Sequence, residues 1–154
     1  MKKHKKILVV GIGSILRSDD GVGVEAIEIL EKEKLPENVS LLGADVSGMN
    51  LLKYFPGHEK IIIIDAAEMG EKAGTVKVFG LNEIEKARFN DKFSTHGMAL
   101  LETLTLGAKL GMRNDITIIG VEPENTGFGL ELSSTIKSRI PQIVEKVKEL
   151  INLK

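Results

Sequence analysis

The chain has 154 residues, a formal net charge of −1 and no cysteine. A near-neutral charge provides no basic field for nucleic-acid binding, and the absence of cysteine excludes disulfides, thiolate metal sites and a cysteine nucleophile. The length fits a single domain over residues 1–154 that buries its own core. Neither a run of about 18 apolar residues nor a signal-peptide core occurs, so we expect a cytoplasmic protein without membrane insertion.

The first predicted element is a strand over residues 5–10 that ends in a glycine turn. Its apolar run, ILVV, is typical of a strand that is covered on both faces. Gly11 and Gly13 then give the backbone the freedom to turn. A dinucleotide-binding loop would need a third glycine where Leu16 stands, so the signal for phosphate binding is weak.

Two adjacent carboxylates, Asp19 and Asp20, follow this turn just before the next predicted helix. Negative charge at a helix N-terminus opposes phosphate binding, which the helix dipole would otherwise favour. The pair therefore suits a metal or a cationic group better than a phosphate. The alternative is that one aspartate caps the helix, which is a common role for this residue type.

The remaining elements alternate between helices and strands along the chain. The clearest is a strand with four consecutive isoleucines, typical of the centre of a parallel sheet. We expect helices over residues 21–34, 49–55 and 97–110, strands over 39–43, 60–65, 75–80 and 115–121, one exposed helical turn within 81–93, and a final helix to about 153 that Ser133 or Ser134 caps.

This alternation predicts an α/β fold, a three-layer sandwich with helices on both faces of a twisted sheet. The sheet should be mostly parallel and contain about five strands. Residues 75–80 alternate between apolar and polar side chains, so we place them in the one antiparallel edge strand. Ligands of such folds bind at the carboxyl ends of the strands.

Three polar groups are predicted at that end of the sheet. Asp20 follows the first strand, Asp65 ends the isoleucine strand, and His96 stands just before a predicted helix. A buried charge at Asp65 is costly unless something pairs with it. The alternatives are that Asp65 accepts backbone N–H bonds and that His96 is a cap or surface residue. The other histidines, His4 and His58, lie in the N-terminal tail and in a turn.

Two carboxylates and an imidazole form a mixed oxygen and nitrogen donor set. Such a set suits nickel, zinc, iron or manganese and leaves positions open for a substrate ligand. A serine triad is a weaker hypothesis, because the chain contains no G-x-S-x-G nucleophile elbow.

The pattern resembles the hydrogenase maturation endopeptidases, which remove a C-terminal extension from the large subunit of nickel-iron hydrogenase after nickel insertion. The resemblance covers nearly the whole chain. It rests on GIGSILRSDDGVGV, SGMNLL, IIIIDAAEMGEKAGTV, STHGMALLETL and IIGVEPENTGFGLELSSTI, in the family's order and spacing. Two departures occur: Ser14 stands where the family usually has Asn, and GADVSG replaces a D-G-G-T-x-G turn. Asp45 consequently lies two places later than the family's acid.

The resemblance implies a hydrolase, an aspartyl-type endopeptidase whose nickel-contacting positions are Asp20, Asp65 and His96. It implies no resident cofactor, because the nickel would arrive with the large-subunit precursor. The metal would polarise the scissile carbonyl or activate a water. Two alternatives stay open at this point: a non-catalytic maturation factor that binds nickel and precursor, and a nucleotide-binding module that uses the first glycine turn.

Overall fold

The computed structural model describes residues 4–43, 48–83 and 95–152, except for the side chains of residues 48–49 and 95–99. Its centre is a five-stranded sheet with the order β2-β1-β3-β5-β4. The strands are β1 (Ile7–Gly11), β2 (Val39–Gly43), β3 (Lys60–Ala66), β4 (Val76–Gly80) and β5 (Asp115–Val121). All neighbouring strands pair in parallel except β4, which pairs antiparallel with β5 at the edge. The predicted sheet, including its edge strand, is confirmed.

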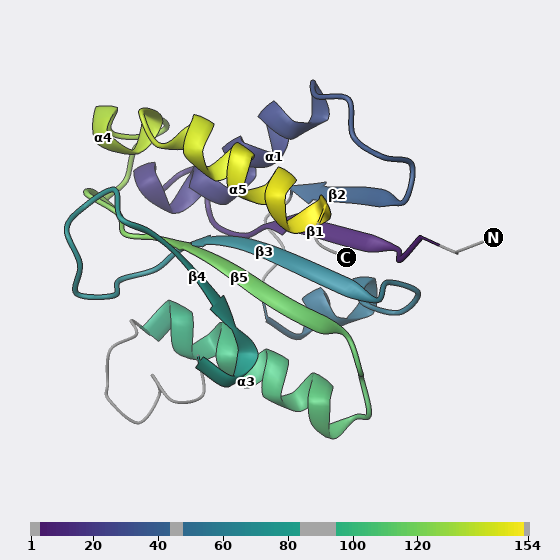
Figure 1. The fold of residues 1–154 in the computed structure, drawn as a ribbon. Coiled ribbons are helices and arrows are strands. Elements are labelled where there is room, and N and C mark those ends of the chain that lie inside the picture. The colour runs from purple at the N-terminus through teal and green to yellow at the C-terminus, as the bar shows by residue number, and fades with distance from the viewer. Residues whose placement is uncertain (1–3, 44–47, 84–94, 153–154) are drawn as a thin grey trace.

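Helices cover both faces of this sheet (Figure 1). They are η1 (Ser18–Gly21), α1 (Val22–Glu31), η2 (Gly48–Tyr54), α3 (Thr95–Lys109), α4 (Ser134–Lys137) and α5 (Ile140–Asn152), where η denotes a 3-10 helix. Figure 1 shows α1 and α5 above the sheet, and α3 below it. This is the three-layer sandwich that the alternation of elements predicts.

Strand β3 supplies the centre of both core layers. All seven of its residues are buried. Because side chains alternate between the faces of a strand, Ile62 and Ile64 pack in the cluster that contains α1 and α5. Ile61 and Ile63 pack on the opposite face, in the cluster that contains η2 and α3. The consecutive isoleucines are therefore explained by burial on two sides.

The first and the last of the predicted helices differ from expectation. The first helix ends at Glu31, three residues before the predicted Lys34. The single predicted C-terminal helix is two helices, α4 and α5. Pro141 stands in the first turn of α5, where its missing N–H is tolerated, but a proline cannot continue a helix from the preceding turn. The predicted cap is confirmed at Ser133, which accepts a hydrogen bond from the backbone N–H of Ile136.

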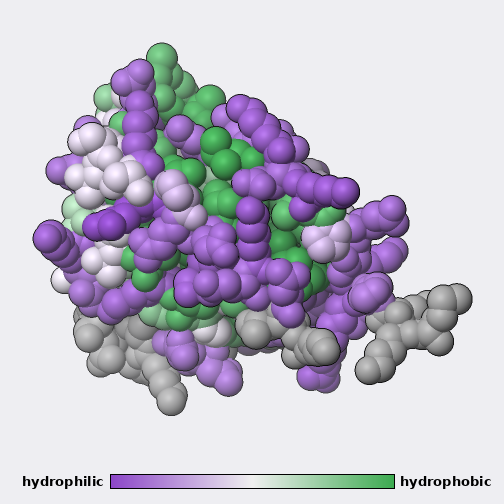
Figure 2. Space-filling view, turned by 45° about the horizontal axis from the view of Figure 1, so that its top comes forward, coloured by the Kyte–Doolittle hydropathy of each residue, from purple (hydrophilic) through white to green (hydrophobic). Residues whose placement is uncertain are grey.

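The surface that carries α1 and α5 is mixed in character. Figure 2 shows hydrophobic patches between hydrophilic side chains on the side of the molecule that is at the top in Figure 1. Within the described ranges, every helix is too short or too polar to cross a membrane. Residues 81–83 are helical, whereas the rest of the predicted turn over 81–93 lies outside the described residues.

Candidate active site

The turn after β1 holds Asp20 in place through a close backbone approach. The backbone N–H of Ser14 donates a hydrogen bond to Asp20 Oδ2 at 2.8 Å. Gly13 has a φ of 134°, which side chains disfavour, and a Cβ there would lie 1.9 Å from the carbonyl oxygen of Asp20. Only glycine fits at this point. Asp20 itself is partly exposed, so its carboxylate is held but remains accessible to a ligand.

The neighbouring Asp19 has a different environment. It is completely buried, and its carboxylate accepts backbone N–H bonds of 2.7 to 2.9 Å from Glu124, Asn125 and Ser133. Neither η1 nor α1 has a side-chain cap. The alternative that one of these aspartates caps the helix is therefore not borne out, and Asp19 instead anchors the segment that follows β5.

Asp65 lies near the end of β3, beside the turn that carries Asp20. It is 2% exposed and is in register with Gly120 of β5. The backbone N–H of Ile12 donates to the carbonyl of Ile64 at 3.0 Å, which ties the end of β1 to the residue before Asp65. Helix η1 packs against β3. The parallel pairing of β1 and β3 thus brings Asp20 and Asp65 to one edge of the sheet.

The segment after Asp65 is held by Glu122, a residue that the sequence analysis did not select. Glu122 is 6% exposed, and its Oε1 accepts hydrogen bonds from the backbone N–H groups of Met69 and Glu71, both at 2.8 Å. These partners lie 53 and 51 residues away along the chain. No local pattern could have indicated a contact that depends on β3 and β5 being neighbours.

His96 lies within the first turn of α3 rather than just before the helix, which corrects the predicted helix start. Figure 1 shows that α3 begins at the end of the molecule where β3 and β5 end. The backbone of His96 is thus at the predicted edge, but its side chain lies outside what the structure describes. Among the described side chains, no group of three or more acidic or histidine residues is placed to hold a metal. The set of Asp20, Asp65 and His96 stays a prediction.

The other histidines lie elsewhere, as expected. Nδ1 of His58 donates to the carbonyl of Tyr54 at 3.0 Å, in the turn that precedes β3 and therefore at the opposite edge of the sheet. His4 is exposed ahead of β1. Asp45 lies outside the described residues.

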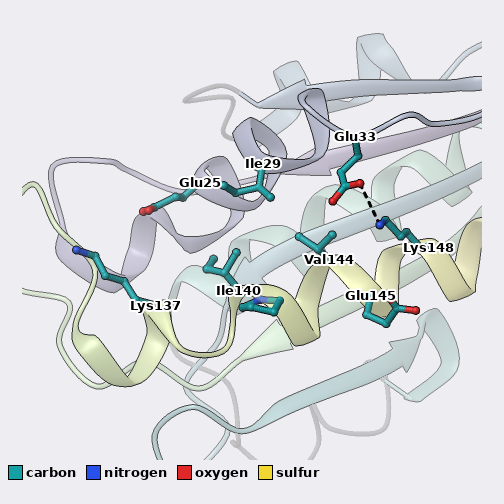
Figure 3. Close-up of a pocket in the computed structure, with 9 residues that line it drawn as sticks. Glu25, Ile29, Glu33, Lys137, Ile140, Val144, Glu145 and Lys148 are labelled. Carbon is teal, nitrogen blue, oxygen red and sulfur yellow. Dashed lines mark ion pairs between the residues drawn. The ribbon is translucent and has the colours of Figure 1, made fainter.

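A separate groove of about 560 Å³ runs between α1 and α5 (Figure 3). Ile29, Ile140 and Val144 contribute its apolar walls, and Lys148 forms an ion pair of 3.1 Å with Glu33 at one end. At the other end, burial raises the pKa of Glu25 above its ordinary value, Lys137 opposes this effect, and Glu28 and Glu131 add to it. The groove lies on the outer helix layer and contains none of the three predicted site residues.

The fold is that of an α/β protein with two acidic residues, Asp20 and Asp65, near the carboxyl edge of a mostly parallel sheet, which is where ligands of open α/β sheets bind. The model of the hydrogenase maturation protease family matches residues 24–150. The chain belongs to this family and is a hydrolase of the protease class, which confirms the resemblance seen in the sequence.

Individual relatives agree with this assignment. The hydrogenase 2 maturation protease of Escherichia coli (strain K12) is 32% identical over 145 residues, which are 92% of this chain and 88% of that protein. The hydrogenase expression/formation protein HupD of Rhizobium leguminosarum bv. viciae is 33% identical, over 91% of this chain and 71% of the relative.

Solved structures agree as well. The hydrogenase maturating endopeptidase HybD from E. coli superposes with a TM-score of 0.84 at 31% identity, covering 95% of this chain and 91% of that one. The [NiFe] hydrogenase maturation protease HybD from Thermococcus kodakarensis gives 0.78 at 29% identity, covering 96% and 99%. The predicted fold class is confirmed by these neighbours.

Proposed function

We propose that this protease removes the C-terminal extension of a nickel-iron hydrogenase large-subunit precursor after nickel has been inserted. The observation that supports the proposal is that Asp20, in η1 after β1, and Asp65, near the end of β3, lie at the carboxyl edge of two adjacent strands, and that Asp20 is held by Ser14 yet accessible. The names of the relatives, which are hydrogenase maturation proteases, support the choice of substrate.

In this proposal nickel is part of the substrate. Carboxylate and imidazole donors suit nickel, and two carboxylates with one imidazole leave positions for ligands from the precursor. Asp20, Asp65 and His96 would complete the coordination of the precursor's nickel, so only a loaded precursor would dock productively. The ion would act as a Lewis acid on the scissile carbonyl or on the attacking water.

The chain's own residues would then position the reacting groups. The Ser14 N–H fixes the direction of the Asp20 carboxylate, and Glu122 fixes the segment that follows Asp65. A carboxylate beside the scissile bond can also take a proton from water as a general base. Pre-set geometry of this kind lowers the reorganisation that the reaction requires.

Mass spectrometry of a cognate precursor, with and without inserted nickel, tests the proposal. We expect loss of the C-terminal extension from the nickel-loaded form alone. Cleavage of both forms would keep the protease and contradict the nickel checkpoint. Binding of the loaded precursor without cleavage would favour a non-catalytic maturation factor instead.

Single substitutions test the three residues. Asp20→Asn, Asp65→Ala and His96→Ala should each reduce cleavage at least about a hundredfold, the scale on which single catalytic groups act. Circular dichroism should show that each variant remains folded. Full activity in a folded variant would remove that residue from the site.

A further inference from the structure

Two loops beside Asp20 expose an unusual concentration of large apolar side chains. Seven large hydrophobic residues are exposed in the described part of the chain, and four of them are in these loops. Ile15 and Leu16 are 58% and 57% exposed, and Phe128 and Leu130 are 87% and 79% exposed. We call these four residues the apolar ridge. Single exposed apolar residues are ordinary, whereas a cluster points to an interaction surface.

Backbone hydrogen bonds join the two loops. The N–H of Ser18 donates to the carbonyl of Gly129, and the N–H of Gly129 donates to the carbonyl of Leu16, both at 3.0 Å. This makes Arg17 and Gly129 an isolated parallel bridge. Because the two loops are joined by this bridge, the residues of the ridge lie together although more than a hundred positions separate them in the sequence.

Side chains fix the arrangement further. The Ser18 hydroxyl donates to the carbonyl of Gly127 at 2.9 Å, and the Arg17 guanidinium lies 4.9 Å from the ring centroid of Phe128. The buried Asp19 carboxylate ties the first loop to the backbone of Glu124 and Asn125. The ridge is therefore preorganised. Binding of a partner to it costs little free energy for ordering these two loops.

The ridge is continuous with the candidate active site. The N–H of Asp20 donates to the carbonyl of Arg17 at 3.0 Å, and Ser14 binds the Asp20 carboxylate. The substrate of a protease is a polypeptide. A substrate chain whose scissile bond lies at Asp20 therefore passes residues 15–17 of the protease within a few residues of that bond. The single positive charge of the first loop, on Arg17, already faces the Phe128 ring.

We propose that the apolar ridge docks an apolar stretch of the precursor polypeptide that flanks the bond to be cut. This inference rests on the proposed function and adds a subsite to it. The four side chains offer hydrophobic contact area, which selects apolar rather than charged residues of the substrate. The ridge thereby contributes to substrate affinity, and the carboxylates nearby carry out the chemistry.

The double variant Phe128→Ser/Leu130→Ser tests the subsite. Its matched control is Leu110→Ser, an equally apolar residue that is 66% exposed just after α3. Binding of the nickel-loaded precursor is measured by titration calorimetry, and cleavage is measured by mass spectrometry over a range of precursor concentrations. We expect Kd and KM to rise at least tenfold in the double variant, with kcat and the melting temperature unchanged, and no effect of the control.

The other outcomes separate the two proposals. Wild-type Kd and KM in the double variant would overturn the subsite and leave the proposed function intact. Ridge-dependent binding of a precursor that is never cut would keep the docking surface and overturn the proposed function. A shift from dimer to monomer in sedimentation, without a change in Kd, would identify the ridge as a self-association surface and overturn the subsite. Failure of the wild type to bind the precursor would overturn both.

Discussion

Asp19 and Ser133 are in direct contact although 114 positions separate them in the sequence. The backbone N–H of Ser133 donates to Asp19 Oδ1 at 2.7 Å, and its hydroxyl oxygen lies 2.8 Å from Oδ2. The same hydroxyl caps α4 by accepting from Ile136. One buried carboxylate thus joins the turn after β1 to the helix start after β5, at the edge where the candidate site lies.

Substitutions of the two adjacent aspartates should therefore affect different properties, stability for Asp19 and cleavage for Asp20. Asp19→Ala removes a buried acceptor and leaves several N–H donors without it, so the free energy of unfolding should fall by about 3 kcal/mol. Asp20→Asn keeps an acceptor for Ser14 and should cost less than about 1.5 kcal/mol, while precursor cleavage is lost. Urea denaturation and the cleavage assay measure the two effects. Equal losses of stability would contradict the division of roles.

Ser133 and Ser134 form a natural pair for testing the junction. Ser133→Ala removes both the cap of α4 and the hydroxyl contact with Asp19, so it should cost about 1 to 2 kcal/mol of stability. Ser134 is exposed on α4, and Ser134→Ala should change stability by less than about 0.5 kcal/mol. Chemical denaturation of both variants measures these two changes in the free energy of unfolding. A larger loss of stability in Ser134→Ala than in Ser133→Ala would contradict the assignment of the cap to Ser133.

The close packing of α1 on the sheet predicts a strict requirement for glycine at position 23. A Cβ on Gly23 would lie 2.4 Å from the carbonyl oxygen of Ile64 and 2.8 Å from that of Ile12. Gly23→Ala should therefore push α1 away from β1 and β3 and cost roughly 3 kcal/mol or prevent folding. The control is Gly80→Ala, since a Cβ at Gly80 meets nothing within 4 Å. The yield of folded protein and the melting temperature report the difference.

Glu25 should give the protein a specific pH dependence. Burial raises the pKa of Glu25 above 4.5, so the folded protein holds this proton more tightly than the unfolded chain. The free energy of unfolding should then fall as pH rises from 4.5 through the raised pKa, and the penalty should stay at neutral pH. Glu25→Gln should remove that slope. Compared with the wild type, the variant should gain more stability at pH 7, where Glu25 is charged, than at pH 4.

The cause of this shift can be tested through the cation that opposes it. Lys137→Met removes the charge that lowers the pKa of Glu25, so it should raise this pKa further and widen the pH range over which stability falls. Urea denaturation from pH 4 to pH 8 measures the slopes of both variants. An unchanged slope in Glu25→Gln would contradict the prediction.

The elements of the fold were predictable because each has a local signature. Four consecutive isoleucines require burial on two faces, and the alternation in TVKVFG requires one exposed face. The break between α4 and α5 was missed because the sequence signals the cap at Ser133 and then the apolar periodicity of α5, which together are typical of one continuous helix. The placement of Asp20 after β1 and of Asp65 near the end of β3 was predictable too, since neighbouring parallel strands finish at one edge of the sheet.

The sequence by itself therefore determined the order of helices and strands, the family, and the acidic edge of the sheet. The tertiary structure decided which of two neighbouring aspartates is an anchor, that Glu122 holds the segment after Asp65, and that Ile15, Leu16, Phe128 and Leu130 form one ridge. The physical reason is the sequence separation of the residues that interact. Burial patterns repeat over a few residues, whereas a hydrogen bond between distant segments exists only once the strand order has placed their backbones side by side.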